Sequence, residues 1–104
     1  MTKVLFSGSE ERLNGFVITG HSTQCSDDLD GKLLCAAVSS AAYMAANGIT
    51  EIAKCECDIE VEDGYMSLTL KEDSDQAQTV LKSLLLHIEQ LTEQYSNIEL
   101  NLEV

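Results

Sequence analysis

The sequence predicts an α+β fold in which two helices pack on a largely antiparallel sheet, in the order β-β-α-β-β-α-β. Short segments in which apolar and polar residues alternate predict half-buried strands, and longer segments with apolar residues at helical spacing predict the helices. Of the 104 residues in the chain, 44% are hydrophobic, which is enough to form a core. The chain is too short to form two domains, each with its own core. We therefore expect residues 1–104 to form a single domain.

The N-terminal third predicts a hairpin followed by a loop. Residues 3–6 and 13–19 contain β-branched and aromatic side chains, and the polar residues 7–11 between them predict a turn. Residues 20–31 are polar and follow neither periodicity. We expect a loop there, long enough to suggest a function.

A helix and a second hairpin are predicted next. Residues 35–46 include six alanines and end at Asn47-Gly48, which is typical of a helix stop. Residues 57–62 and 65–70 alternate with period two around Asp63-Gly64, a pair that favours a type I′ turn.

The last elements are a second helix and a final strand. Ser74 or Asp73 is placed to cap the helix. Its apolar residues recur at helical spacing: Ala77, Val80, Leu81, Leu84, Leu85, Ile88, Leu91 and Tyr95. We expect this helix to cover one sheet face. From Ile98 to Val104 the residues alternate as in a half-buried strand.

Acidic residues dominate the charge of the chain. Eighteen Asp and Glu against six Lys and Arg give a net charge of −12. Nucleic-acid binding requires Lys and Arg to neutralise phosphates, so we expect no direct nucleic-acid partner and instead a basic protein partner. The alternative is that the carboxylates are ordinary solvated surface.

The expected compartment is the cytoplasm. No apolar run reaches the ~18–20 residues of a membrane span, so we expect no membrane contact. Ser7-Gly8 also interrupt the N-terminal apolar residues before they reach the length of a secretory signal. In this compartment the four cysteines are expected to be reduced.

Cys35 is a candidate nucleophile and His21 a candidate base. A catalytic thiol needs a base and hydrogen-bond donors for the developing oxyanion. Cys35 stands at the start of the alanine-rich segment, where the free N–H groups of a helix start stabilise a thiolate and an oxyanion. His21 stands where the second strand ends, so the loop would have to fold back to join them. The structural alternative is a packed cysteine and a surface histidine.

The other cysteines and the second histidine are weaker candidates. Cys55 and Cys57 lie on one face of a strand with no second pair at zinc-finger spacing, so packing is the simpler expectation. His87 lies between apolar helix positions and is expected to border the core. One further combination offers zinc ligands: His21, Cys25 and Cys35. Since Cys25 reads more simply as an incidental thiol, we expect neither a metal nor a cofactor.

Two segments resemble one known family. Gly20-His21, followed after the loop by residues 33–39 (Leu-Leu-Cys-Ala-Ala-Val-Ser), is similar to the ribosomal-processing cysteine protease family, Prp. Residues 61–68 resemble the second hairpin of that family. The resemblance implies a bacterial cysteine endopeptidase that removes an N-terminal extension from a large-subunit ribosomal protein, the twenty-seventh. It implies Cys35 as the nucleophile and His21 as the general base, and a substrate with a basic N-terminal segment.

The loop departs from the family pattern. That pattern commonly has an aspartate three residues before the cysteine and an alanine after the histidine, where this chain has Lys32 and Ser22. Asp28 and Asp30 are the remaining candidates to orient His21.

Ser39 and the loop are the other residues with an implied role. Ser39 matches a serine of the family and stands one helical turn beyond Cys35, so it would point the same way as the thiol. The loop would cover the site and bind substrate, through Ser22, Thr23 and Gly31. The alternative function is a non-enzymatic acidic binding module for a basic ribosomal protein or assembly factor, in which Cys35 is only packed.

The alanine-rich helix also predicts a homodimer. It carries small or apolar residues on nearly every side, and one domain has few places to bury a second apolar face. Met44 and Tyr43 are the expected contacts. The alternative is that the second helix covers this face in a monomer.

Overall fold

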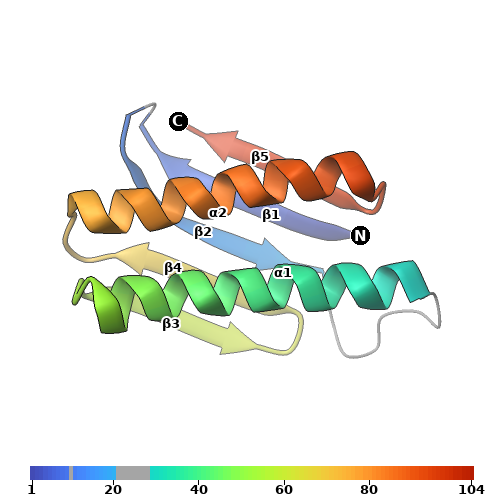
Figure 1. Ribbon diagram of the computed structural model, residues 1–104, viewed down its shortest axis with the longest axis horizontal. Coiled ribbons are helices and arrows are strands. Elements are labelled where there is room, and N and C mark those ends of the chain that lie inside the picture. Colours follow the sequence, from blue (N-terminus) through green and yellow to red (C-terminus); the bar gives the residue numbers. More distant parts are fainter. Residues whose placement is uncertain (10, 21–28) are drawn as a thin grey trace.

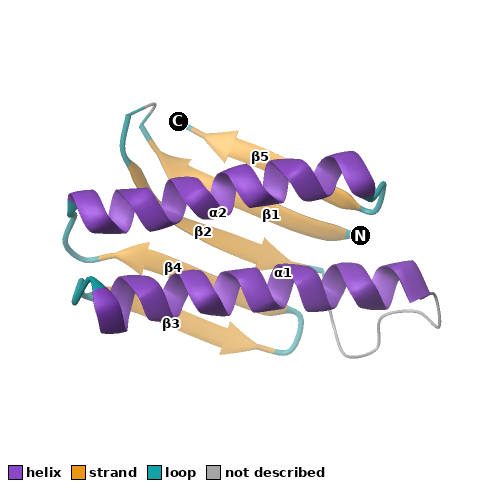
Figure 2. Cartoon of the chain, viewed as in Figure 1, coloured by secondary structure: helices purple, strands orange, loops and turns teal. Residues whose placement is uncertain are grey.

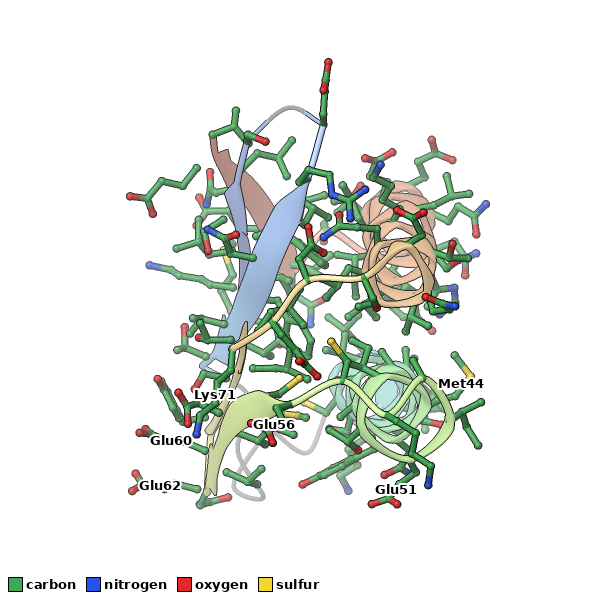
Figure 3. The ribbon with its side chains drawn as sticks, turned by 90° about the vertical axis from the view of Figure 1, so that its left-hand side faces the viewer. Met44, Glu51, Glu56, Glu60, Glu62 and Lys71 are labelled. Atoms are coloured by element: carbon green, nitrogen blue, oxygen red, sulfur yellow. The ribbon has the colours of Figure 1, made fainter. Side chains whose placement is uncertain are left out.

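The fold is a two-layer sandwich, with one sheet and both helices on the same face of it (Figure 3). The computed structural model describes residues 1–9, 11–20 and 29–104 (Figure 1). The elements are β1 (Thr2–Gly8), β2 (Leu13–Thr19), α1 (Leu29–Asn47), the π-helical turn η1 (Gly48–Ile52), β3 (Cys57–Glu62), β4 (Tyr65–Leu70), α2 (Asp75–Gln94) and β5 (Ile98–Glu103). The predicted fold class and element order are confirmed (Figure 2).

The sheet has five strands in the order β3-β4-β2-β1-β5. Three of its pairings are antiparallel, and β5 pairs parallel to β1. Helix α2 supplies the crossover that this parallel pairing requires, since it leads from β4 back across the sheet to β5. Strands β3 and β5 are therefore the two edges of the sheet.

The core lies between the sheet and the helices. Phe6 and Phe16 are paired across β1 and β2, and their ring centroids are 5.9 Å apart. Helix α1 buries a stripe that is mostly small: Leu34, Val38, Ala42, Ala45 and Ala46. Small side chains let the helix lie close to the sheet, and Figure 1 shows α1 running along the β3–β4 side of the sheet.

Helix α1 begins at Leu29, six residues before the predicted start. Leu29, Leu33 and Leu34 follow helical spacing, and Gly31 between them is buried inside the first turns of the helix. A glycine in polar surroundings reads as loop in the sequence, whereas here it fits a face that packs closely. The prediction of a loop through residue 31 is therefore wrong at its C-terminal end, and Gly31 belongs to the helix and not to a covering loop.

The α-helix α1 ends at Asn47, as the sequence predicts, and the π-helical turn η1 follows it. The predicted turn type, however, needs correction. In the second hairpin only Gly64 has a positive φ, of 76°, whereas a type I′ turn needs positive φ at both central residues. This φ pattern is that of a type II turn, which equally demands glycine at the second position.

Helix α2 begins where the sequence predicts. Of the two candidate caps, Ser74 is the residue whose Oγ accepts a hydrogen bond from the N–H of Ala77, at 3.1 Å. Tyr95 lies just beyond the last helical residue and not within the helix. Gln78 is buried and bonds both the N–H and the C=O of Leu13, at 2.8 Å each, so the start of α2 is fixed to the start of β2.

One helical stretch is long and apolar enough to cross a membrane. It runs over residues 31–52, which corrects the expectation that no segment approaches that length. In this fold the stretch comprises residues 31–47 of α1 together with η1, and 33% of its most apolar window is buried.

Candidate active site

A pocket of about 330 Å³ opens between α1 and the end of the β3–β4 hairpin. Helix α1 forms one wall, the hairpin forms the opposite wall, and Ile18 of β2 lies between them. The lining residues are Ile18, Cys35, Ala36, Ser39, Ala42, Tyr43, Val61, Glu62, Asp63, Gly64, Tyr65 and Met66. Most of these side chains are apolar, so the pocket suits an apolar part of a ligand.

Cys35 lies half-buried on the side of α1 that faces the hairpin. Ser39, four residues further along the helix, lines the same pocket. The structure thus brings these two predicted site residues together. A half-buried thiol in such a pocket is reachable by a bound ligand while neighbouring side chains exclude part of the water.

The position of Cys35 within α1 differs from the expected one. Because the helix begins at Leu29, Cys35 is its seventh residue, and the unpaired N–H groups of the helix start belong to residues 29–32. The stabilising effect of a helix start decreases within the first turn. The prediction that Cys35 stands at the helix start, beside these amides, is therefore wrong.

The chain leaves β2 next to this pocket. The N–H of Gly20 donates a hydrogen bond to the C=O of Gly64, at 3.2 Å, and Gly64 lines the pocket. Since His21 directly follows Gly20, the chain reaches the candidate base from the rim of the pocket.

Gly20 cannot be replaced by another residue without strain. Its φ is +85°, and a Cβ at this position would lie 2.2 Å from the carbonyl oxygen of Met1. Only glycine combines this backbone conformation with such a close approach. The glycine of the Gly-His pair therefore has a structural reason, which is to turn the chain at the end of β2.

The remaining predicted site residues are placed only in part. The candidates His21, Ser22, Thr23, Cys25 and Asp28 lie outside the described residues. The backbone of Asp30 belongs to the first turn of α1, and its side chain also lies outside what is described.

The thiols of Cys55 and Cys57 both donate hydrogen bonds to backbone carbonyl groups. The Cys55 thiol is buried and donates to the C=O of Glu72, at 3.0 Å, while the Cys57 thiol donates to the C=O of Cys55, at 3.5 Å. Burial raises the pKa of Cys57 to about 11, and electrostatic interactions with Cys55, Asp58 and Glu72 add to this. A thiol with this pKa is a poor nucleophile at neutral pH.

His87 lies elsewhere, on the outer side of the helix layer. It is exposed and lines a shallow groove between the two helices together with Ala37, Ser40, Ala41 and Met44. The prediction that it borders the core is wrong, because its position on α2 turns it about a quarter-turn away from the buried stripe. Within residues 1–9, 11–20 and 29–104, no three His, Cys, Asp or Glu side chains are grouped as metal ligands.

The hairpin wall is the part of the site that sequence reasoning missed. The alternation of residues 57–70 predicts the hairpin but not which helix lies over its end. A signal was present in Gly64, because a glycine that must have positive φ at a hairpin tip often allows close approach of another segment. Here that segment is the end of β2.

Fold and pocket together define a small α+β protein with a half-buried cysteine in a mostly apolar pocket. A family model described as "Cysteine protease Prp" matches residues 1–98. The chain belongs to the cysteine protease Prp family, whose role is ribosomal protein processing. No curated protein matches the sequence.

Solved structures show the same fold. The SMU.848 protein of Streptococcus mutans is 23% identical, with a TM-score of 0.88, and the match covers 99% of this chain and 97% of that one. The ribosomal processing protease Prp of Staphylococcus aureus, in complex with a substrate peptide, is 20% identical with a TM-score of 0.89, and 99% and 100% of the chains are covered. A second S. aureus Prp structure holds a covalently linked product peptide; it is 24% identical, with a TM-score of 0.86 and the same coverage.

Proposed function

We propose that the protein is a cysteine endopeptidase that removes an N-terminal extension from a large-subunit ribosomal protein, the twenty-seventh. The observation that carries the proposal is the half-buried Cys35 in a mostly apolar pocket, in a chain of the cysteine protease Prp family. The proposed reaction takes place in the cytoplasm and uses no cofactor.

The proposed chemistry uses two side chains. His21 accepts the proton of the Cys35 thiol, and the thiolate attacks the scissile carbonyl to form a tetrahedral intermediate. His21 then gives that proton to the leaving amine as the peptide bond breaks, which leaves an acyl-enzyme on Cys35 that water hydrolyses. The bond between Gly20 and Gly64 supports this pairing, because it fixes the residue before His21 at the pocket.

The other proposed roles surround this pair. Ser39 is proposed as a positioning residue, since it lines the pocket one turn beyond Cys35. Asp28 or Asp30 is proposed to orient His21, and Ser22 and Thr23 to bind the substrate. The homodimer stays a prediction; Tyr43 and Met44 are exposed on α1, as such a contact would require (Figure 3).

A peptide that spans the processing junction tests the function. The wild-type protein is expected to cleave it, Cys35→Ala to abolish cleavage, and Cys57→Ala, the matched thiol deletion, to retain it. The pH profile of Cys35 alkylation tests the pairing: His21→Ala should move the profile toward that of a free thiol. An identical profile with and without His21 would show that the histidine is not the base. Tight binding of the basic ribosomal protein without cleavage would instead favour the acidic binding module.

A further inference from the structure

Strand β3 offers a free edge beside the candidate active site. It is the first strand in the sheet order and pairs with β4 alone among the described strands. Residues 58–62 are all exposed, and β3 contains no proline that would remove a backbone donor. The outer side of β3 therefore presents backbone N–H and C=O groups in the arrangement that accepts another strand.

One face of this edge is apolar and incompletely covered. Ile59 and Val61 point to the helix side of the sheet, in register with Leu68 and Met66 of β4. Leu68 and Met66 are 0% and 5% exposed, whereas Ile59 and Val61 are 40% and 49% exposed. The buried apolar row of the sheet thus continues onto β3, where it is only about half covered.

The other face of the same edge is acidic. Asp58, Glu60 and Glu62 alternate with the apolar residues and lie on the side of the sheet without helices. Figure 3 shows Glu60 and Glu62 directed away from the helix layer. Asp58 is 3.4 Å from the ammonium group of Lys71, while Glu60 and Glu62 are the two exposed carboxylates of β3 closest to its hairpin end.

The edge leads to the pocket that contains Cys35. Val61 and Glu62 are the last two residues of β3, and both line that pocket. A strand added along β3 would therefore run past the hairpin end, where the pocket opens.

We propose that β3 binds an extended peptide as a sixth strand, in which apolar residues facing α1 alternate with cationic residues facing the carboxylate row. Cross-strand neighbours of opposite charge stabilise such a pair, and apolar neighbours would cover Ile59 and Val61. That this peptide is the substrate rests on the proposed function. The alternation also selects the register in which the peptide binds, because a peptide shifted by one residue would place its cationic side chains on the apolar face.

A second copy of the chain fits this edge poorly. Pairing β3 with β3 of another copy would place the carboxylate rows on the same face, and like charges on neighbouring strands are destabilising. The charge pattern thus favours a cationic peptide over self-association.

Two probe peptides test the proposal without relying on cleavage. One alternates five lysines with five valines, and the other has the same composition in two blocks. Both are titrated against the full chain carrying Cys35→Ala, and Kd is measured by fluorescence anisotropy at low salt. We expect the alternating peptide to bind about tenfold more tightly. Two N-methylated versions of the alternating peptide differ in phase: one carries methyl groups on the amides of its odd-numbered residues, the other on those of its even-numbered residues. One phase should abolish binding and the other should leave it nearly unchanged, because an edge strand forms backbone hydrogen bonds with alternate residues only.

A pair of matched variants separates local charge from total charge. Glu60→Gln with Glu62→Gln should weaken the alternating peptide about two- to thirtyfold, from two cross-strand ion pairs. Glu89→Gln with Glu93→Gln removes the same charge from exposed positions on α2 and should change Kd less than twofold.

Several results would overturn the strand proposal. These are equal affinity for the two peptides, equal effects of the two N-methylation phases, equal effects of the two variant pairs, or no binding at all. The proposed function fails differently, by a lack of junction cleavage in the wild-type protein. If the wild-type protein and the Glu60→Gln/Glu62→Gln variant cleave the ribosomal precursor equally well, only the strand proposal is refuted.

Discussion

Replacing Gly20 with alanine is expected to damage both stability and the site. The residue has a φ of +85°, which costs a residue with a Cβ about 1–2 kcal/mol. The new Cβ would also lie 2.2 Å from the Met1 carbonyl oxygen, so β1 and β2 must separate locally. The bond from Gly20 to Gly64 would then be lost, at about 0.5–1.5 kcal/mol. We expect the free energy of unfolding to fall by about 2–3 kcal/mol in total.

Gly48→Ala is the matched control for this substitution. Gly48 has no positive φ, and a Cβ there would lie 3.6 Å and 3.7 Å from the two methyl groups of Val80, which is ordinary contact. Alanine should stabilise this helical position by about 0.4–1 kcal/mol, through the unfolded chain.

The assay combines thermal unfolding with cleavage. The mass of each variant is measured first, to verify that Met1 is present. For a domain of this size 1 kcal/mol shifts Tm by about 4–8 °C, so Gly20→Ala should lower Tm on the order of 10–20 °C while Gly48→Ala raises it slightly. At a temperature where both variants are folded, only Gly20→Ala should lose cleavage, because the hydrogen bond that fixes Gly20, the residue before His21, at the pocket is lost. Equal Tm values and equal cleavage rates would refute the account of Gly20.

Three further predictions concern other parts of the molecule. Gln78→Ala leaves the buried N–H and C=O of Leu13 without their side-chain partners. The free energy of unfolding, measured with urea, should therefore fall by about 2–4 kcal/mol, and a loss below about 0.5 kcal/mol would contradict this. Because its pKa is about 11, Cys57 should react with iodoacetamide slowly at pH 8 and faster toward pH 11, as followed by peptide mass; rapid labelling at pH 8 would show that its thiol is not so perturbed. The hydrogen bond from Arg12, and then that from Gln78, lowers the pKa of Asp73 below its ordinary value of 3.8. The ionised carboxylate therefore stabilises the fold at pH values above 3.8, and this stabilisation is lost as the pH falls through the lower pKa of the folded state. Asp73→Asn should therefore lower Tm at pH 7 and make Tm less dependent on pH below 4, which parallel Tm curves would contradict.

Most of the fold is predictable because its elements have strong periodicities. Residues 13–19, 57–62 and 65–70 have the strand boundaries that alternation gives, and Ser74 caps α2 as its sequence suggests. The start of α1 is less predictable because Asp30 and Gly31 read as loop residues. Both residues nevertheless belong to the first turns of α1, where Gly31 is buried, and no local pattern in the sequence reveals this burial.

The site is only partly predictable for a similar reason. The sequence identifies Cys35 and Ser39 as neighbours on one helix, and the structure places both in one pocket. Its opposite wall comes from residues 61–66, whose alternation indicates a face but not the height or position of the helix above it. The same limit applies to Ile59 and Val61, whose alternation predicts a common face but not that they are 40% and 49% exposed at the sheet edge.

The most direct test of the central claim is the mass of a ribosomal protein precursor after incubation with this protein. The twenty-seventh large-subunit protein of the same organism, carrying its N-terminal extension, is mixed with wild-type protein or with Cys35→Ala, and intact masses are followed over time. We predict a single trimmed product with the wild-type protein and none with Cys35→Ala, which keeps the helix because alanine is a good helix former. A precursor that stays intact with the wild-type protein, or is trimmed equally by Cys35→Ala, would contradict the assignment.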